Sequence, residues 1–232
     1  MTGIIKFIIK LLLLYTAINV FVILFFRFLL PPVSAYIYIN TDENLQSLFT
    51  LNDIRQILVA LDKISDNTIL AVVASEDQRF FEHFGFDFQQ IEKAMKENVV
   101  RKRIRGASTI SMQTARNMFL WSGKNFLRKA IEAYYTLLLE LCWSKSRIIE
   151  VYLNIAEMGN GIYGVGAASR IYFGKSPLKL TPSEAASLAA VLPNPKKRDP
   201  RKPSSYLLKR KSQILEQMNL LGGTRILKPY LN

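Results

Sequence analysis

Residues 72–85 have the sequence VVASEDQRFFEHFG, in which an acidic pair and the only histidine of the chain stand among apolar and aromatic side chains. The spacing predicts a helix over 67–83, because these residues recur at steps of three and four: Ile69, Val72, Val73, Glu76, Phe80 and His83. Glu76 therefore falls on the face that its neighbours mark for burial. Partial burial moves a carboxyl pKa toward neutrality, which suits a general base. The segment alone leaves two interpretations open: Glu76 is such a base, or it forms a structural pair with His83.

The remaining segments predict a mainly helical, all-α fold. Apolar residues recur at helical spacing in four further places, at 53–61, 126–143, 145–158 and the alanine-rich 183–192. Thr181 and Glu184 form a capping box with proline at the first helical position, so the last of these helices begins there. Strand-like alternation is scarce, and the glycine-rich stretch 159–174 predicts tight turns.

A long apolar segment lies near the N-terminus. Residues 4–26 are apolar apart from Lys6, Lys10 and a few small polar residues, and a helix of that length crosses about 30 Å of hydrocarbon. A cleaved signal peptide is the alternative, but its apolar core is shorter, about 7–15 residues, and no small-residue cleavage site follows here. The positive-inside rule places the N-terminus in the cytoplasm. We expect a cytoplasmic N-terminus and uncleaved anchor over 1–30, a connector over 31–52, and an outward-facing folded domain over 53–232.

The chain is strongly basic, with a formal net charge of +13. Two basic runs concentrate this charge, at residues 101–105 and 196–202, and such an excess indicates an anionic partner. Nucleic acid is the usual partner, but an outward-facing anchored domain meets anionic lipid headgroups and lipid-linked phosphates instead. The alternative is that both runs are solvated faces. Cys142 is the only cysteine, so it forms no internal disulfide and is expected to be a small buried residue.

Two further segments hold candidate functional residues. In GASTISMQTARNMFL, residues 106–120, small residues before Thr109 predict a close backbone turn. Gln113, Arg116 and Asn117 share one face of the following helix, which either grips a polar ligand or meets water.

The segment 124–143 is apolar nearly all round yet holds Glu132, four residues after Arg128. Either these two form an ordinary salt bridge, or Glu132 is a second recessed carboxylate beside cations. No set of Cys, His and acidic residues has metal-ligand spacing, so no metal site is expected.

Taken together, these segments resemble the peptidoglycan glycosyltransferase family, specifically its monofunctional, membrane-anchored Gram-negative members. The family motif E-D-x-x-F-x-x-H-x-G-x-D is matched in full, by Glu76, Asp77, Phe80, His83, Gly85 and Asp87. GASTISMQ matches G-G-S-T-I-x-Q-Q except at Ala107 and Met112. R-K-x-x-E is matched by Arg128, Lys129 and Glu132, and Y-L-N by residues 152–154. The resemblance extends from about residue 60 to about residue 200.

The resemblance implies a lysozyme-like fold with a membrane-proximal jaw, and a reaction that polymerises lipid II, a disaccharide-pentapeptide on undecaprenyl pyrophosphate. In that reaction Glu76 is the base and Glu132 a second essential carboxylate. The implied substrate-binding residues are Asp77, Phe80, His83, Thr109, Gln113, Arg116, Asn117, Lys124 and Arg128. Arg116, Lys124 and Arg128 would face the departing pyrophosphate. The family usually has lysine where Arg116 stands and often arginine where Lys124 stands, so the charge is kept while the geometry changes.

The same resemblance implies the partners and the location. No cofactor is required, and an optional Mg²⁺ ion would assist departure of the pyrophosphate. Nucleic acid is not a partner. The expected partners are lipid II, the growing glycan strand and the membrane. Because no transpeptidase domain fits after residue 200, cross-linking is expected from a separate transpeptidase, alongside division or elongation proteins. The expected location is the inner membrane, with a single span and the catalytic domain on the periplasmic side.

Two other functions stay open. A lysozyme-like hydrolase or lytic transglycosylase would share the fold and one glutamate, but it does not require several cations around a leaving group. An inactive membrane-anchored scaffold would bind cell-wall precursors, but it has no need to retain both Glu76 and Glu132.

Overall fold

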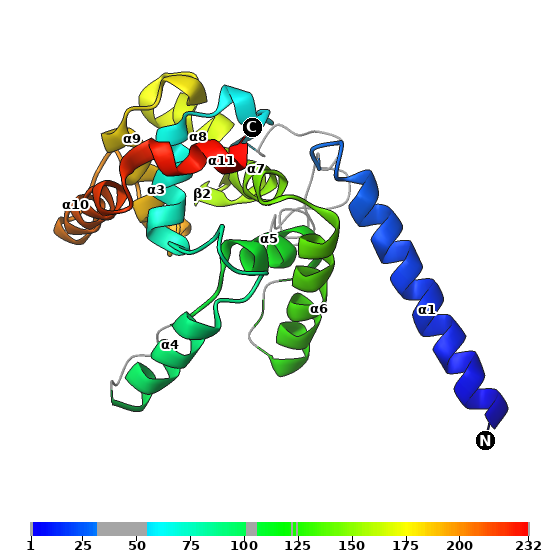
Figure 1. Ribbon diagram of the computed structural model, residues 1–232. Helices are drawn as coiled ribbons and strands as arrows, with labels where there is room; N and C mark the ends of the chain where they lie inside the picture. The colour runs from blue at the N-terminus through cyan, green and yellow to red at the C-terminus, as the bar shows by residue number, and fades with distance from the viewer. Residues whose placement is uncertain (1, 32–54, 101–105, 122, 124, 232) are drawn as a thin grey trace.

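The computed structural model describes residues 2–31, 55–100, 106–121, 123 and 125–231 (Figure 1). Helices dominate these residues, as the sequence predicted. The α-helices are α1 (Thr2–Phe25), α3 (Asp66–Glu76), α4 (Phe88–Val100), α5 (Ile110–Phe119), α6 (Phe126–Cys142), α7 (Lys145–Ile155), α8 (Gly164–Phe173), α9 (Pro182–Val191), α10 (Ser205–Leu220) and α11 (Lys228–Leu231). The 3₁₀ helices are η1 (Leu61–Lys63), η2 (Pro177–Lys179), η3 (Pro195–Lys197) and η4 (Gly223–Leu227). The strands β1 (Arg55–Gln56), β2 (Glu157–Gly159) and β3 (Ile162–Tyr163) form a small sheet in the order β1-β3-β2.

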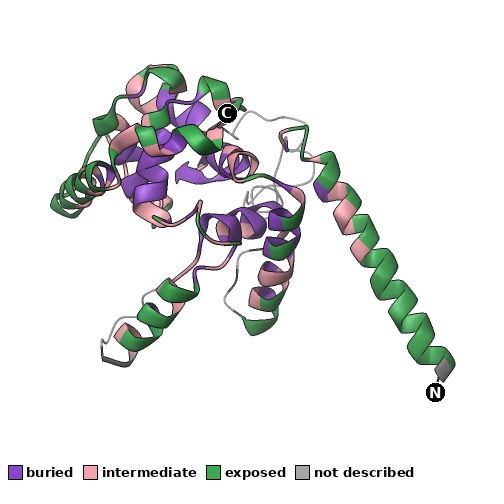
Figure 2. Cartoon of the chain, viewed as in Figure 1, coloured by how far each residue is buried: buried purple, intermediate pink, exposed green. Residues whose placement is uncertain are grey.

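α3 is the central helix of the body. It is buried on every side from Thr68 to Ala74, which marks it as a core helix (Figure 2). α9 packs against it, and α10 and η4 also contact it. The small side chains of α9 let the two helices approach closely; the fully buried ones are Ala185, Ala186, Ala189 and Ala190. The C-terminal end of α3 is therefore held in a fixed place.

The helix predicted over 67–83 is confirmed only as far as Glu76, where α3 ends. Asp77, with φ −160° and ψ 80°, turns the chain into a loop that leads to α4. The Asp77 carboxylate accepts a hydrogen bond from the backbone N–H of Ile110 (3.0 Å) and lies 3.0 Å from Nε2 of His83. Apolar spacing gives no sign of such contacts. Phe80 and His83 therefore lie in this loop and not on a helical stripe with Glu76.

The helix predicted over 53–61 is wrong for the residues described there. β1 pairs in parallel with β3, and residues 57–60 have no regular structure. Val59 is instead held by Asn154 of α7, whose Oδ1 accepts from the Val59 N–H (2.7 Å) and whose Nδ2 donates to the Val59 carbonyl (2.8 Å). A buried amide on a distant helix thus replaces the helical hydrogen bonds of this segment.

The other predicted helices are confirmed, one of them in a shorter form. α6 covers almost all of the predicted 126–143, and α9 begins with the predicted capping box. The helix predicted over 145–158 ends at Ile155, because the residues that follow enter the sheet as β2. Of the turns predicted for the glycine-rich stretch, one is present at Gly161 (φ 65°), between β2 and β3. Gly164–Phe173 form α8, a helix that the sequence analysis did not predict.

α4, α5 and α6 form a second lobe, and α4 and α6 project to the same side of the body as α1 (Figure 1). Phe126, at the start of α6, is 90% exposed. The other large apolar side chains that these helices and their connections expose are Phe84, Phe88, Met95, Trp121, Leu127, Leu137 and Leu141. An exposed apolar surface of this kind indicates contact with a membrane or a protein. The resemblance implied a membrane-proximal jaw, and this lobe is the candidate for it.

α1 is compatible with a single-pass membrane anchor. The most apolar stretch of Gly3–Phe25 has a mean hydropathy of 2.4, and only 6% of that stretch is buried. The 24 residues of α1 rise about 36 Å at 1.5 Å each, compared with about 30 Å of bilayer hydrocarbon. The helix is therefore long and apolar enough to cross a membrane.

Polar contacts join α1 to the folded domain. The Tyr135 hydroxyl of α6 donates to Asn19 Oδ1 (2.8 Å). Just beyond the C-terminus of α1, Arg147 donates to the carbonyls of Phe26 (2.7 Å) and Leu29 (2.6 Å). These bonds fasten α1 and the residues that follow it to α6 and α7.

Candidate active site

A groove built from three cavities that share walls crosses the body beside the end of α3. The central cavity, of about 850 Å³, is lined by Glu76 of α3, by Gln113 and Arg116 of α5 and by Arg210 of α10. An α4-side cavity of about 510 Å³ shares Glu76 and Arg210 with it. On the other side, an arginine cavity of about 420 Å³ shares Gln113 and Arg116. Glu76 thus faces an open groove and is not sealed in the core.

Glu76 is half-buried, and both of its carboxylate oxygens accept hydrogen bonds. Oε1 accepts from Ser75 Oγ (3.0 Å) and Oε2 from Gln113 Nε2 (3.0 Å). Gln113 is itself oriented by Tyr152, whose hydroxyl donates to Gln113 Oε1 (3.2 Å). Burial, followed by the nearby Glu76 carboxylate, raises the pKa of Tyr152 well above its ordinary value, so the phenol stays protonated and continues to donate. Each Glu76 oxygen has further lone-pair capacity for a ligand.

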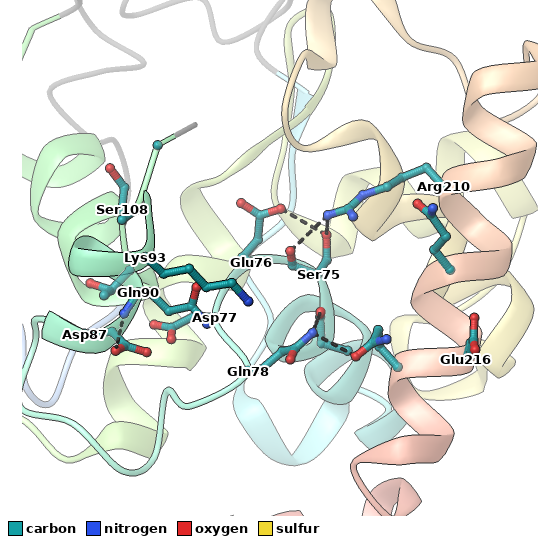
Figure 3. Close-up of a pocket in the computed structure, with 16 residues that line it drawn as sticks. Ser75, Glu76, Asp77, Gln78, Asp87, Gln90, Lys93, Ser108, Arg210 and Glu216 are labelled. Atoms are coloured by element: carbon teal, nitrogen blue, oxygen red, sulfur yellow. Dashed lines mark hydrogen bonds between the residues drawn. The ribbon is translucent and has the colours of Figure 1, made fainter. Parts of the chain in front are cut away.

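Ser75 and Arg210 were not identified from the sequence. Arg210 donates from Nη2 to the backbone carbonyl (3.0 Å) and to Oγ (3.2 Å) of Ser75, and Ser75 in turn donates to Glu76 (Figure 3). α10 is therefore connected to the Glu76 carboxylate through a single residue. The only sign in the sequence that Ser75 belongs to the site was its position directly before Glu76. Arg210 stands 135 positions away from Ser75 in the chain, and no spacing links the two.

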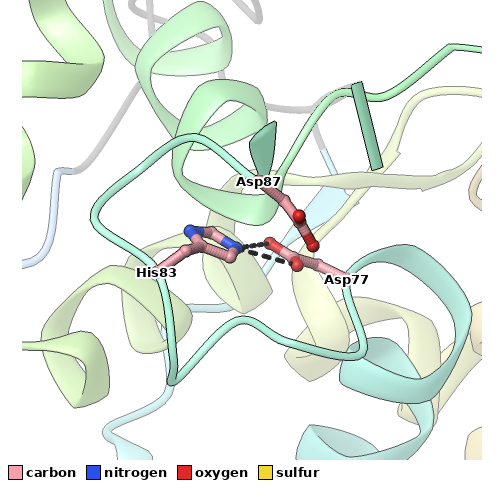
Figure 4. A group of neighbouring side chains, drawn as sticks. All are labelled: Asp77, His83 and Asp87. Atoms are coloured by element: carbon pink, nitrogen blue, oxygen red, sulfur yellow. Dashed lines mark hydrogen bonds and ion pairs between the residues drawn. The ribbon is translucent and has the colours of Figure 1, made fainter. Parts of the chain in front are cut away.

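Asp77, His83 and Asp87 form a compact cluster beside Glu76 in the chain, with their ligand atoms within 4.8 Å of one another (Figure 4). His83 Nε2 lies 3.0 Å from Asp77 Oδ1, so the alternative pairing of His83 with Glu76 is not formed. Asp87 Oδ1 accepts from the backbone N–H of Gln90 (3.0 Å), while its Oδ2 is buried without a partner in the described part of the chain. Carboxylate and imidazole groups are ligands for divalent ions. These three residues could hold a metal, and sequence spacing had not indicated the group.

The segment before α5 forms one wall of the groove. Gly106 and Ser108 line the central cavity, and residues 106–109 run along it without the close turn that the sequence predicted. Thr109, 2% exposed, is the N-cap of α5 and accepts from the backbone N–H of Met112 (3.2 Å). Its hydroxyl also donates to the Gly85 carbonyl (2.6 Å), so it fastens α5 to the loop after Glu76.

The arginine cavity gathers cationic side chains from two helices. Arg116 of α5 and Arg128 of α6 both line it, together with Asn117. Arg116 Nε donates to Asn117 Oδ1 (3.3 Å). The Nε of Arg128 is buried and has no hydrogen-bond partner among the described residues. Two guanidinium groups at one cavity suit an anion with several oxygens, such as a phosphate.

Glu132 lies behind this cationic pair, 2% exposed, and lines none of the three cavities of the groove. Its Oε2 accepts from Arg128 Nη1 (2.6 Å) and its Oε1 from Lys129 Nζ (2.5 Å). Both interpretations that the sequence left open therefore hold in part: the salt bridge is formed, and the carboxylate is recessed beside cations. In this arrangement Glu132 orients Arg128 toward the cavity.

The remaining predicted residues have varied positions. Phe80 is fully buried, and neither it nor His83 lines the three cavities, so the structure gives these two no contact with the groove. Lys124 and the basic run at 101–105 lie outside the described residues. The run at 196–202 is largely exposed and includes an ion pair between Asp199 and Arg201 (2.8 Å). Cys142 is a free, half-buried thiol whose pKa is raised by burial.

Known proteins resemble the chain over most of its length. A family model described as Transglycosylase matches residues 42–219. A protein from Haemophilus influenzae named biosynthetic peptidoglycan transglycosylase is 54% identical over 201 residues, which are 86% of this chain and 82% of the relative. Relatives with the same name occur in Bacteroides thetaiotaomicron, 49% identical over 91% of this chain and 85% of the relative, and in Pasteurella multocida, 50% identical over 90% and 87%.

Proposed function

The chain belongs to the transglycosylase family, and on that premise we propose that it polymerises peptidoglycan glycan strands from lipid II. The reaction transfers the lipid-linked MurNAc C1 of the donor to the GlcNAc 4-hydroxyl of the acceptor and releases undecaprenyl pyrophosphate. One observation supports this assignment above the others. The Glu76 carboxylate lies in an open groove, directly beside a cavity that two arginines line.

Glu76 is the general base of the proposed reaction. Its carboxylate takes the proton of the 4-hydroxyl while the O4–C1 bond forms and the bond from C1 to the pyrophosphate oxygen breaks. Attack on the face opposite the leaving group inverts C1 from α to β. The hydrogen bonds from Ser75 and Gln113 hold the carboxylate in one orientation, which a base needs in order to meet the hydroxyl at hydrogen-bond distance.

The leaving group departs toward the arginine cavity. The electrons of the breaking bond remain on the pyrophosphate, and the guanidinium groups of Arg116 and Arg128 stabilise that charge as it develops. Lys124 adds to this set in the proposal. Glu132 acts through Arg128 by fixing its side chain. Asp77 and Thr109 line the α4-side cavity of the groove, next to Glu76. They also fasten the loop after Glu76 to the start of α5.

A membrane location follows from the lipid substrate. We propose that α1 spans the inner membrane once and that the catalytic domain lies on the periplasmic side, where the exposed apolar lobe of α4–α6 meets the bilayer. Enzyme and lipid II are then confined to one surface, which raises their effective concentration. The proposal requires no cofactor, and Mg²⁺ would supply additional charge neutralisation at the pyrophosphate.

The test uses the detergent-solubilised full chain and labelled lipid II. We expect a polymer that a muramidase degrades, and no polymer would refute the function. Glu76→Gln keeps the shape of the side chain but removes the base, so turnover should fall by about 10²–10⁴-fold. Normal strand formation by this variant would remove Glu76 from the role. Glu92→Gln, at an exposed ion pair on α4, is the matched control and should polymerise normally.

A further inference from the structure

Glu157 is a carboxylate of the groove that the proposed reaction does not use. It is the first residue of β2, directly after α7, and is 8% exposed. Its side chain lines the arginine cavity together with Arg116 and Arg128. The groove therefore holds a buried acid in the very cavity where the anionic leaving group is proposed to bind.

The two oxygens of Glu157 have different surroundings. Oε1 accepts a hydrogen bond from the backbone N–H of Gly161 (3.3 Å), which fixes the carboxylate at the turn between β2 and β3. Within the described residues, Oε2 accepts no hydrogen bond, and it does not belong to the buried unpartnered atoms that are sealed from solvent. Oε2 therefore keeps its acceptor capacity, on a residue that lines the arginine cavity.

A carboxylate in this place needs a partner. Burial raises the pKa of Glu157, whereas the Gly161 hydrogen bond and the charge of Lys196 act to lower it. Burial is the largest of these effects, so the surroundings destabilise the ionised carboxylate. An acid also repels a pyrophosphate, which makes it a poor part of the phosphate site itself. A hydrogen-bond donor on a neutral part of the substrate satisfies the free oxygen without that repulsion. The sugar bonded to the pyrophosphate carries such donors, as hydroxyl and acetamido N–H groups.

Resting on the proposed function, we propose that Glu157 is a sugar-binding residue, whose Oε2 accepts a hydrogen bond from a hydroxyl or acetamido N–H of the donor saccharide. The arginines then hold the pyrophosphate while Glu157 holds the adjoining sugar. The two contacts together fix the C1–O bond relative to Glu76. They also distinguish a complete lipid-linked saccharide from a bare lipid diphosphate. The bare diphosphate can bind the arginines, but it has no sugar hydroxyl or N–H group to donate to Glu157.

The test compares two ligands in the full chain. Lipid II carries both sugar and pyrophosphate, whereas farnesyl diphosphate carries only the latter. In a Glu76→Gln background, which prevents turnover, we would measure the Kd of each ligand with and without Glu157→Gln. The glutamine keeps an oxygen for the Gly161 N–H and presents an NH₂ group to the cavity. A hydrogen bond to a charged acceptor is lost, so the Kd for lipid II should rise about tenfold. The Kd for farnesyl diphosphate should stay the same or fall.

Three outcomes would overturn the inference: no change for lipid II, an equal weakening for both ligands, which would indicate a purely structural role, or a weakening for farnesyl diphosphate alone. If Glu157→Gln does not fold, Glu157→Asp, which keeps the charge and shortens the side chain, carries the same comparison and the same expected difference. Glu92→Gln is the control for a lost charge. Polymer formation by the wild-type chain is measured separately, so a failed inference about Glu157 is distinguishable from a failed function.

Discussion

The buried ion pair of Arg128 and Glu132 gives a prediction whose magnitude follows from the structure. The side chains are 10% and 2% exposed, so Glu132→Gln leaves Arg128 without an ion-pair partner among the described residues. Removing one partner of a buried pair costs about 3–5 kcal/mol. The glutamine oxygen still accepts one hydrogen bond, which offsets about 1 kcal/mol. We expect a net loss of about 3 kcal/mol, or a fall in Tm of roughly 6–12 °C for a chain of this size.

The measurement is unfolding of the detergent-solubilised protein, followed by circular dichroism. The double variant Glu132→Gln/Arg128→Gln removes both charges. Its loss of unfolding free energy should therefore be smaller than the sum of the losses in the two single variants by at least about 1 kcal/mol. Glu92→Gln breaks an exposed pair with Lys96 and should change stability by less than about 1 kcal/mol. If Glu132→Gln costs no more than this control, or if the two single losses simply add, the pair is not the buried unit described above.

Three shorter predictions concern the groove, the pH dependence and the packing. Arg116→Ala should raise the KM for lipid II or lower kcat, and Arg116→Lys should restore part of the loss; unchanged kinetics would discard the pyrophosphate assignment. Burial acts to raise the pKa of Glu184, but hydrogen bonds from Lys175 and Thr181 outweigh it and hold the pKa below its ordinary value. The resulting stability is present above the unfolded carboxyl pKa of about 4.3 and is lost as the pH falls through the lower folded value, so Glu184→Gln should lose less stability than wild type on acidification. A Cβ at Gly166 would lie 2.1 Å from the Ile57 carbonyl, so Gly166→Ala should cost about 1–3 kcal/mol, while Gly106→Ala, with no atom within 4 Å, should fold normally.

The features that the sequence predicted best are encoded by residues close together in the chain. α9 begins at Pro182, directly after its N-cap Thr181, because Thr181 and Glu184 cap each other within one turn. The loop after Glu76 could not be predicted in this way. Its course depends on Asp77 binding the backbone of Ile110, 33 positions later. Residues 57–60 likewise follow a contact between Val59 and Asn154 that spans 95 positions. Apolar periodicity reflects only local spacing, so it cannot predict contacts between residues this far apart in the chain.

The candidate site shows the same division. The motifs supplied Glu76 and Gln113, and the structure joins them by a direct hydrogen bond. Arg210 stands in a basic run of α10 that resembles any solvated helix face, and only the fold brings it to Ser75. Glu157 was hidden in a segment that the sequence assigned to a helix. In the structure this helix ends at Ile155, and Glu157 is the first residue of β2.

The way α1 meets the domain sets the working geometry of the whole enzyme. Trp143 donates to the Ile23 carbonyl (2.8 Å) and Arg147 to the two carbonyls just beyond the helix, so the folded domain is bonded to the C-terminal end of α1. In the proposed membrane arrangement, with α1 in the bilayer, these bonds would hold Glu76, the proposed base, at one height and one angle above the lipid surface. Each lipid-linked monomer of the proposed reaction would then arrive at the same depth, and the finished strand would leave in a constant direction.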